Sequence, residues 1–387
     1  MNSLSHLSKK KGSGGKRINE PEGFIVEEIF NGENVTELNL ENVDNSEYIT
    51  FVLEKKNLTT YDAIRFLSDS LKVDVKRFSI AGQKDKNAIT YQLVSCWKGR
   101  EISSEKLMEI SKKNHNIKIA RIWNTNFKVR IGTLTGNSFT IRLTEVEDIG
   151  AVERIMQENG DIIPNYFGPQ RFGTRSTNVD VARCILLKDY ESAIKYLLKI
   201  PENESISECQ EANELGLYEK RISNFLKERG YDSDSFRNAI KMIPASILKL
   251  ILDSYQSYLF NVELSFRIKN KLMEPLENDK TCGFNRYGFV DLDSSGNQIV
   301  CSQLIGYDSR PNDVIKDILW EEGIEIGDFK LREFPGLNLN GSWRPLFVNV
   351  KDLNIKKDND EYELKFKLTK GAYATSFLRE ITDIKRI

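Results

Sequence analysis

The sequence predicts an α+β protein in which a mostly helical domain is inserted into a mixed-sheet domain. Up to about residue 175, alternating runs of β-branched and aromatic residues are interspersed with helical patterns. Between residues 179 and 269 apolar residues recur at helical spacing, and strand-like runs then return. We therefore expect a flexible basic tail at 1–20, a mixed domain at 21–175 plus 341–387, and an inserted domain at 176–340.

The first part of the chain alternates strands with short helices. A threonine at position 59 or 60 can cap a helix in which Ile64, Leu67 and Leu71 share one face. A serine at position 103 or 104 can open a second helix in the same way. The strands expected here are 24–30, 48–54, 89–97, 117–123 and 137–144, and a further helix is expected at 148–158.

The middle of the chain is dominated by helical patterns, and strands become frequent again only towards the end. The expected helices are 179–187, 190–198, 219–227, 235–242, 245–269 and 312–322, with a last one after Gly371. The expected strands are 284–292, 298–301, 346–350 and 362–369.

Composition argues against several classes of protein. The net charge of the 387 residues is -1, so a nucleic acid would have to be bound by local clusters of basic residues. The cysteines show no CxxC pair, and His6 and His115 lie far from every motif below, which argues against a disulfide framework, a zinc site and a histidine-based triad. The sequence shows neither a membrane-spanning apolar run nor a signal peptide, so we expect a cytoplasmic protein.

The most informative segment, 79–90, places Asp85 between Lys84 and Lys86. Flanking ammonium groups favour the ionised carboxylate, which suits a base, a nucleophile or a stabiliser of positive charge. The two lysines are also suitable phosphate ligands. The plainer interpretation is a charged turn between two strands, and only other motifs in the chain could decide between the two.

The second motif, 164–175, interleaves three aromatic residues with two arginines. Aromatic rings such as Phe167 can stack on bases, and an arginine such as Arg171 can hold a phosphate or stack on a base. Asn165 can pair with a base edge. The alternative is a loop that its aromatic residues anchor in the core.

Three further segments carry weaker signals. Residues 130–139 read as a tight turn before a strand, with Lys128 and Arg130 available for phosphate contacts. Residues 254–261 lie on the long expected helix, where Tyr255 and Leu259 favour core packing. Residues 368–380 read as a strand end, a glycine turn and a helix start whose amides could bind an anion.

Taken together, these runs resemble the TruD family of tRNA pseudouridine synthases. The matching runs are AGQKDKNAITYQ, RIGTLTGNSF, NYFGPQRFGTR, SYQSYLFN and LTKGAYATSFLRE, together with the entry segment at 22–29. The resemblance implies a pseudouridine-synthase catalytic domain with a family-specific inserted domain. It also implies isomerisation of uridine to pseudouridine, usually at position 13 of tRNA, with tRNA as the partner and without a cofactor or metal. Neither a membrane nor a protein partner is expected from the sequence.

The resemblance assigns roles to particular residues. Asp85 occupies the position of the catalytic aspartate, Phe167 that of the aromatic residue packed against the target base, and Asn165 that of an asparagine near the active site. The resemblance also implies a basic residue before the first strand, at Lys16 or Arg17. One departure is Asn87, where many family members have histidine.

Other functions remain open at this point. A non-catalytic RNA-binding protein or a tRNA-folding chaperone would keep the basic and aromatic loops but would not need Asp85. A methyltransferase should show a glycine-rich cofactor loop after a strand, and the sequence has none of convincing form.

Overall fold

The computed structural model describes residues 4–99, 102–173, 177–201, 204–207 and 216–382, which leaves Arg175 of the second motif outside the described residues. The chain divides into two compact units. Unit 1 comprises residues 1–6, 165–283 and 292–346, and unit 2 comprises residues 7–164, 284–291 and 347–387. The expected insertion at 176–340 differs from unit 1 at its edges: the aromatic motif from Asn165 onward lies in unit 1.

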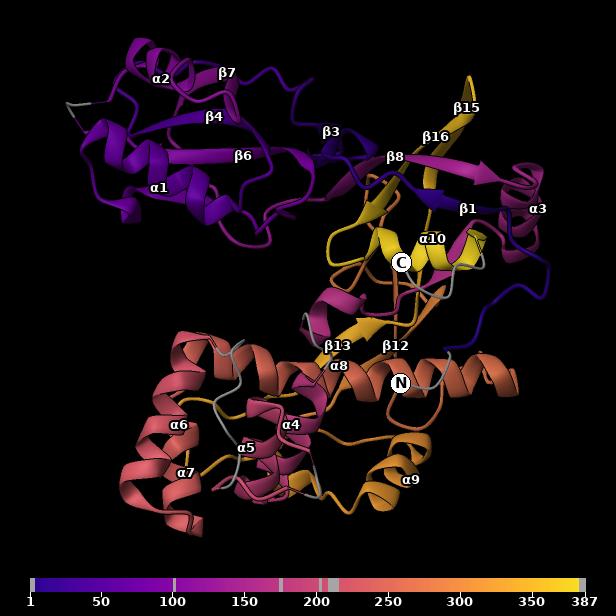
Figure 1. Ribbon diagram of the computed structural model, residues 1–387. Helices are drawn as coiled ribbons and strands as arrows, with labels where there is room; N and C mark the ends of the chain where they lie inside the picture. Colours follow the sequence, from indigo (N-terminus) through magenta and orange to yellow (C-terminus); the bar gives the residue numbers. More distant parts are fainter. Residues whose placement is uncertain (1–3, 100–101, 174–176, 202–203, 208–215, 383–387) are drawn as a thin grey trace. The chain divides into compact units, whose positions relative to one another are not determined.

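Unit 2 is built on a sheet that has ten strands among the described residues (Figure 1). All pairs on its main path are antiparallel except β2 with β6, which run parallel. The path runs through β15 (Lys351–Asp358), β16 (Glu361–Thr369), β8 (Gly136–Val146), β2 (Phe24–Phe30), β6 (Ile89–Trp97), β4 (Tyr48–Lys56) and β7 (Ile117–Thr125). Off this path, β1 (Gly14–Arg17) pairs with β8, β3 (Glu33–Asn34) with β2, and β5 (Phe78–Ile80) with β6.

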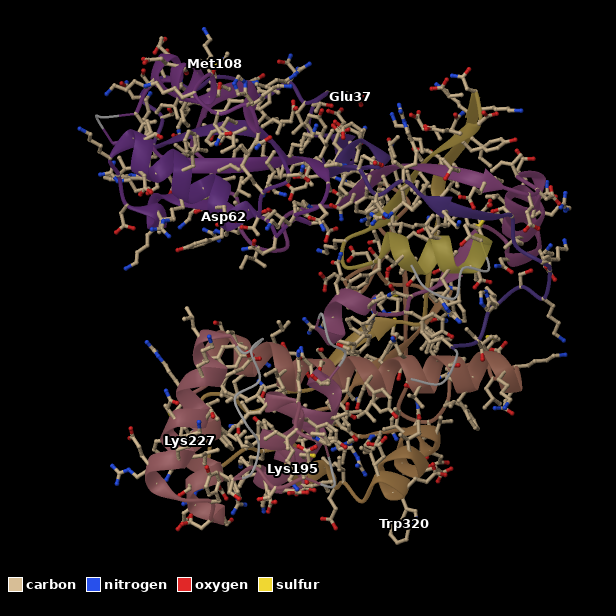
Figure 2. All side chains as sticks on the ribbon, in the orientation of Figure 1. Glu37, Asp62, Met108, Lys195, Lys227 and Trp320 are labelled. Carbon is tan, nitrogen blue, oxygen red and sulfur yellow. The ribbon has the colours of Figure 1, made fainter. Side chains whose placement is uncertain are left out.

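Helices cover two apolar cores on this sheet. Helices α3 (Gly150–Asn159) and α10 (Ala374–Thr382) pack on one core, where the ring of Phe366 lies 5.4 Å from Phe139 and 4.1 Å from Phe377. Helices α1 (Thr60–Leu71) and α2 (Ser104–Ser111) close the other core. Asp62 on α1 and Met108 on α2 project from the polar faces of these amphipathic helices (Figure 2).

A short two-stranded sheet and several turns complete unit 2. Strand β9 (Ile162–Pro164) pairs with β14 (Phe347–Asn349). The chain leaves unit 2 after β9, passes through it again at 284–291, and returns to it for good at β14. Strand-like pieces were expected near residues 284–292, and two short ones lie at the ends of this stretch with a turn between them. Within this stretch, Phe284, which ends β10 (Lys280–Phe284), and β11 (Val290–Asp291) are extended, and Asn285 Oδ1 accepts the N–H groups of Tyr287 and Phe289 in the turn between them, in which Gly288 has φ 73°.

Unit 1 is mostly helical, as the periodicity predicts. Its central helix is α8 (Ala245–Asn270), in which Tyr255 and Leu259 are fully buried. The other helices are α4 (Asn178–Leu186), α5 (Tyr190–Leu198), α6 (Leu217–Arg229), α7 (Ser233–Lys241) and α9 (Asp313–Glu322). Strand β12 (Ile299–Leu304) pairs with β10 (Lys280–Phe284) and with β13 (Ser342–Pro345).

The segment expected to be a flexible tail contains ordered structure. Strand β1 pairs with β8 through Lys16 opposite Thr144, and the main-chain N–H of Ser13 donates to Ile381 O at 2.7 Å. The strand consists of two glycines followed by two basic residues and has no apolar alternation, so the sequence pattern does not predict this pairing. In the described part of the chain, no helix is both long and apolar enough to cross a membrane.

Candidate functional site

Asp85 follows β5 in a short connection that leads into β6. Its residue is half-buried, and its main-chain carbonyl accepts a hydrogen bond of 2.6 Å from Lys55 Nζ. Lys55 lies near the end of β4 and is fully buried. A buried ammonium group therefore fixes the backbone at the residue that carries the candidate carboxylate.

The environment of Lys55 disfavours its charged, ammonium form. Burial lowers the pKa of Lys55 from 10.5 to about 8; the negative charge of Asp85 opposes this shift, and the positive charge of Lys84 adds to it. The ammonium group thus loses its proton much closer to neutral pH than an ordinary lysine does. Sequence reasoning missed this residue, because the expected strand ended at position 54 and Lys55 stands between Glu54 and Lys56.

Lys84 occupies an internal position. Its side chain is only 7% exposed, and its Nζ lies 3.0 Å from Glu28 Oε1 and 2.6 Å from Asn137 Oδ1. Its main-chain N–H also donates to Thr60 Oγ1 at 3.0 Å. This geometry favours a role in holding the segment in place over the phosphate contact suggested by the sequence, whereas Lys86 is exposed.

Glu28 is the buried counter-ion of Lys84. Burial raises the pKa of Glu28, and the charge of Lys84 and the N–H of Leu93, which donates to Glu28 Oε2 at 2.9 Å, oppose the rise. Glu28 comes from β2, Lys84 from the Asp85 segment and Asn137 from β8. The ion pair and the amide therefore tie strands β2 and β8 to the segment that carries Asp85.

Two of the weaker motifs meet the Asp85 segment in unit 2. Gly132 N–H donates to Ala81 O at 3.1 Å, which joins the loop before β8 to the start of the Asp85 segment. Lys370 Nζ donates to Gly132 O at 3.2 Å, and Lys370 N–H donates to Thr135 O at 3.3 Å. Segments separated by more than two hundred residues in the sequence thus share one site, which no single motif revealed.

The aromatic motif is held inside unit 1. Phe167 is 8% exposed, and its main chain makes two hydrogen bonds with the side chain of Asn261 on α8, at 2.8 and 3.0 Å. Its ring meets Phe260 edge to face at 5.7 Å. This geometry fits both interpretations of the motif. The ring is anchored in the core, and a ring held in this way is also preorganised to stack on a base.

Arg344 on β13 organises the same motif. Its guanidinium lies 3.9 Å from the centre of the Phe167 ring and donates to Asn165 O and to Asn165 Oδ1, the latter at 2.7 Å. Arg344 is 8% exposed, so it acts within the protein. No sequence pattern pointed to Arg344, because this residue lies far along the chain from the motif that it supports.

The other two predicted basic residues already have partners. Arg171 donates to Ser257 Oγ at 3.1 Å and lies 3.5 Å from Asp253 Oδ2, with its side chain 27% exposed. Lys16 on β1 lies 2.6 Å from Glu145 Oε2 at the surface. Asp85, Lys84, Lys86 and Lys16 belong to unit 2, and Asn165, Phe167 and Arg171 belong to unit 1.

Comparison with known proteins identifies the fold and the class. The family model described as tRNA pseudouridine synthase D (TruD) matches residues 1–381. A protein from Methanococcus aeolicus named probable tRNA pseudouridine synthase D is 34% identical, over 93% of this chain and 94% of its own length. A protein of the same name from Thermococcus sibiricus is 30% identical, over 98% of both.

A solved structure has the same fold. The crystal structure of a TruD protein from Methanosarcina mazei superposes with a TM-score of 0.72, covering 98% of this chain and 96% of that one at 24% identity. The mixed sheet and these matches define an enzyme of the pseudouridine synthase class. Within that class, the chain belongs to the TruD family of tRNA pseudouridine synthases, and the resemblance carried by the sequence motifs is confirmed.

Proposed function

We propose that this enzyme converts uridine 13 of tRNA to pseudouridine, with Asp85 as its catalytic carboxylate. The observation that carries the assignment of Asp85 is the set of buried ionisable groups that holds its segment in place. The buried Lys55 holds the Asp85 carbonyl, and the buried Glu28–Lys84 pair fixes the preceding residue. A charged turn without function would not require three buried ionisable groups beneath it.

The reaction breaks the bond between N1 and C1′ of uridine, turns the uracil and joins C5 to C1′. The proton at C5 is lost and N1 gains one, so substrate and product are isomers and no oxidant or outside nucleophile is consumed. An ionised carboxylate at Asp85 can attack C1′, add to the uracil ring, or remove the 2′ proton to form a glycal. Each route needs the uridine to leave its stack.

Side chains around Asp85 suit a polyanionic substrate. Lys86, Lys128, Arg130 and Lys370 are exposed, and their segments meet in unit 2. We assign them to phosphate contacts and assign Lys84 to positioning. In unit 1 we assign Phe167 to the target base, with Arg171 in a supporting role in RNA binding, and we assign Asn165, whose buried amide hydrogen-bonds to Arg344 and to Pro345 O, to positioning this motif. In unit 2, Lys16 keeps a supporting role in RNA binding.

Replacement of Asp85 by asparagine tests the catalytic assignment. Asp85→Asn keeps the size of the side chain, so we expect pseudouridine formation to be abolished while the affinity for tRNA stays within a few-fold of wild type. Pseudouridine is mapped at single-nucleotide resolution in tRNA transcripts, and affinity is measured by filter binding. Turnover of Asp85→Asn above a few per cent of wild type would remove Asp85 from the chemistry.

A matched control separates a local effect from a global one. Asp69→Asn alters a carboxylate on α1 whose side chain is 73% exposed, and it should leave both activity and affinity unchanged. Binding without any pseudouridine from the wild-type enzyme would favour the RNA-binding or chaperone alternative. Modification at another nucleotide would retain the role of Asp85 and replace uridine 13 as the target.

A further inference from the structure

The loop between β7 and β8 presents a large apolar side chain to solvent. Ile131 is 89% exposed, although its neighbour Val129 is buried. A single exposed apolar residue is common on protein surfaces and needs no explanation by itself. Three properties distinguish Ile131: the rigidity of its loop, the place where the loop is attached, and the charge around it.

The loop is held in place on both sides of Ile131. Val129 N–H donates to Ser95 Oγ at 2.9 Å, and Thr135 N–H donates to Ile29 O at 2.8 Å. Between these points, Thr133 Oγ1 donates to Arg130 O at 2.6 Å, and Gly132 adopts φ 84°, which suits a tight turn. Little conformational entropy is therefore lost when Ile131 makes a contact.

The loop is attached directly to the Asp85 segment. Gly132, the residue after Ile131, donates its N–H to Ala81 O at 3.1 Å, and Ala81 precedes Asp85 by four positions. The carbonyl of the same glycine accepts from Lys370 Nζ. Ile131 is thus presented from the same part of unit 2 as the proposed catalytic carboxylate.

The surroundings of Ile131 are basic. Lys128 and Arg130 precede Ile131 in its own loop, and Lys370 Nζ donates to Gly132 O beside it. Lys128, Arg130 and Lys370 are exposed. An apolar side chain surrounded by cations fits a nucleic acid, in which phosphates are held by the cations while an apolar group enters between bases.

We propose that Ile131 is an apolar wedge that enters the RNA base stack beside the target uridine and stabilises the stack after that uridine has left it. This inference rests on the proposed function, since it assumes an RNA substrate whose uridine must become unstacked. The wedge would occupy the space between neighbouring bases, and the cations of the loop would hold the flanking phosphates.

Single-turnover rates on two substrates test the wedge. Ile131→Ser should slow modification of folded tRNA about 10-fold, because the unstacked state loses its apolar support. On a mutated tRNA whose target uridine is already unpaired and unstacked, the same variant should stay within about 2-fold of wild type, because that substrate needs less help. Ile131→Leu should keep most of the rate on both substrates.

Leu217→Ala is the matched control, because Leu217 is 87% exposed but lies on α6 of unit 1. It should change neither rate. An equal loss of rate for Ile131→Ser on both substrates, or no loss on either, would overturn the wedge. Absence of pseudouridine from the wild-type enzyme on both substrates would instead refute the proposed function.

A direct measurement of unstacking is independent of turnover. With 2-aminopurine placed beside the target uridine, binding of Asp85→Asn enzyme should raise its fluorescence, and the double variant Asp85→Asn/Ile131→Ser should give a markedly smaller rise at saturating protein. An equal rise for the two proteins would mean that Ile131 does not stabilise the opened stack.

Discussion

At the scale of single residues, the site depends on buried charges that the surface does not reveal. Lys55 is fully buried, and its Nζ contacts the main chain of Asp85, the residue proposed to do the chemistry. The charged groups that influence it are Asp85, which favours its ammonium form, and Lys84, which disfavours it and is itself paired with Glu28. Lys55 is therefore a positioning residue whose protonation state is coupled to the site.

The lowered pKa of Lys55 makes its contribution dependent on pH. Since this pKa is about 8, the ammonium form is lost as the pH rises through that value, and kcat should fall there. Lys55→Met keeps the length of the side chain without the charge, so it should lower kcat more than it raises KM. A pH profile of kcat that retains the same alkaline limb in Lys55→Met would show that Lys55 does not cause it.

Lys55 also affects the stability of the protein, and its effect on stability changes with pH in the direction opposite to its effect on kcat. Between about pH 8 and 10.5 the folded state binds fewer protons than the unfolded state, so Lys55 makes the free energy of unfolding rise with pH in this window. Urea unfolding at several pH values should show this rise in wild type and not in Lys55→Met. The two measurements together separate catalysis from folding.

Phe167 tests the role of the aromatic motif. Phe167→Ala should lose activity by 10-fold or more, because an aromatic face contributes about 1–3 kcal/mol per stacked base. The ring is also buried against Phe260, so this variant leaves a cavity and destabilises unit 1. Phe167→Leu fills most of that cavity without an aromatic face, and Phe167→Tyr keeps the face.

Rates per folded molecule, measured alongside thermal unfolding, distinguish the two roles of Phe167. If Phe167→Leu turns over as wild type does, the ring serves only as a core anchor. A loss of rate in Phe167→Leu that Phe167→Tyr does not share would support stacking. Phe260→Leu, which alters the partner ring on α8, is the control for packing alone.

At the scale of secondary structure, prediction succeeded where one element buries a clear face. Strand β2 alternates as expected from 24 to 30, and α5 has the predicted bounds. Strand β15 was missed, because its sequence KDLNIKKD is mostly exposed and its pairing depends on β16. Asp85 was proposed from its local motif, whereas Lys55, Glu28 and Arg344 act through contacts with distant segments that no local pattern records.

Strand β1 gives a prediction about the N-terminal segment. Deleting residues 1–17 should lower the Tm of unit 2 by several degrees, because it removes the pairing with β8 and the hydrogen bond from Ser13 to Ile381. Lys16→Ala removes only the exposed ion pair with Glu145 and should change Tm little. Scanning calorimetry of both proteins distinguishes strand pairing from charge. An unchanged Tm in the deletion would mean that β1 contributes nothing to stability.

At the scale of the whole molecule, a net charge of -1 conceals a local basic surface. If Lys86, Lys128, Arg130 and Lys370 each contact a phosphate, log Kd should change with log salt with a slope of about 3, since each contact contributes about 0.7–0.9. Lys86→Ala should reduce the slope by roughly one contact. Lys112→Ala, at the C-cap of α2, should leave the slope unchanged. A flat salt response in wild type would exclude these residues from backbone binding.

The connectivity of unit 2 has a consequence for how the protein is made. On one edge of β8 lie β1 and β2, which precede it in the chain, but the other edge pairs with β16, as in Phe139 opposite Phe366. A ribosome delivers residues 361–369 only after most of unit 1 has been synthesised. Unit 1 can thus complete its own core first. During that time one edge of β8 stays unpaired, and a strand of a neighbouring nascent chain could pair with it. The entropy cost of closing a loop grows only slowly with its length, so the long separation between β8 and β16 has little effect on the stability of the folded protein. The late arrival of β16 instead slows folding and raises the risk of aggregation.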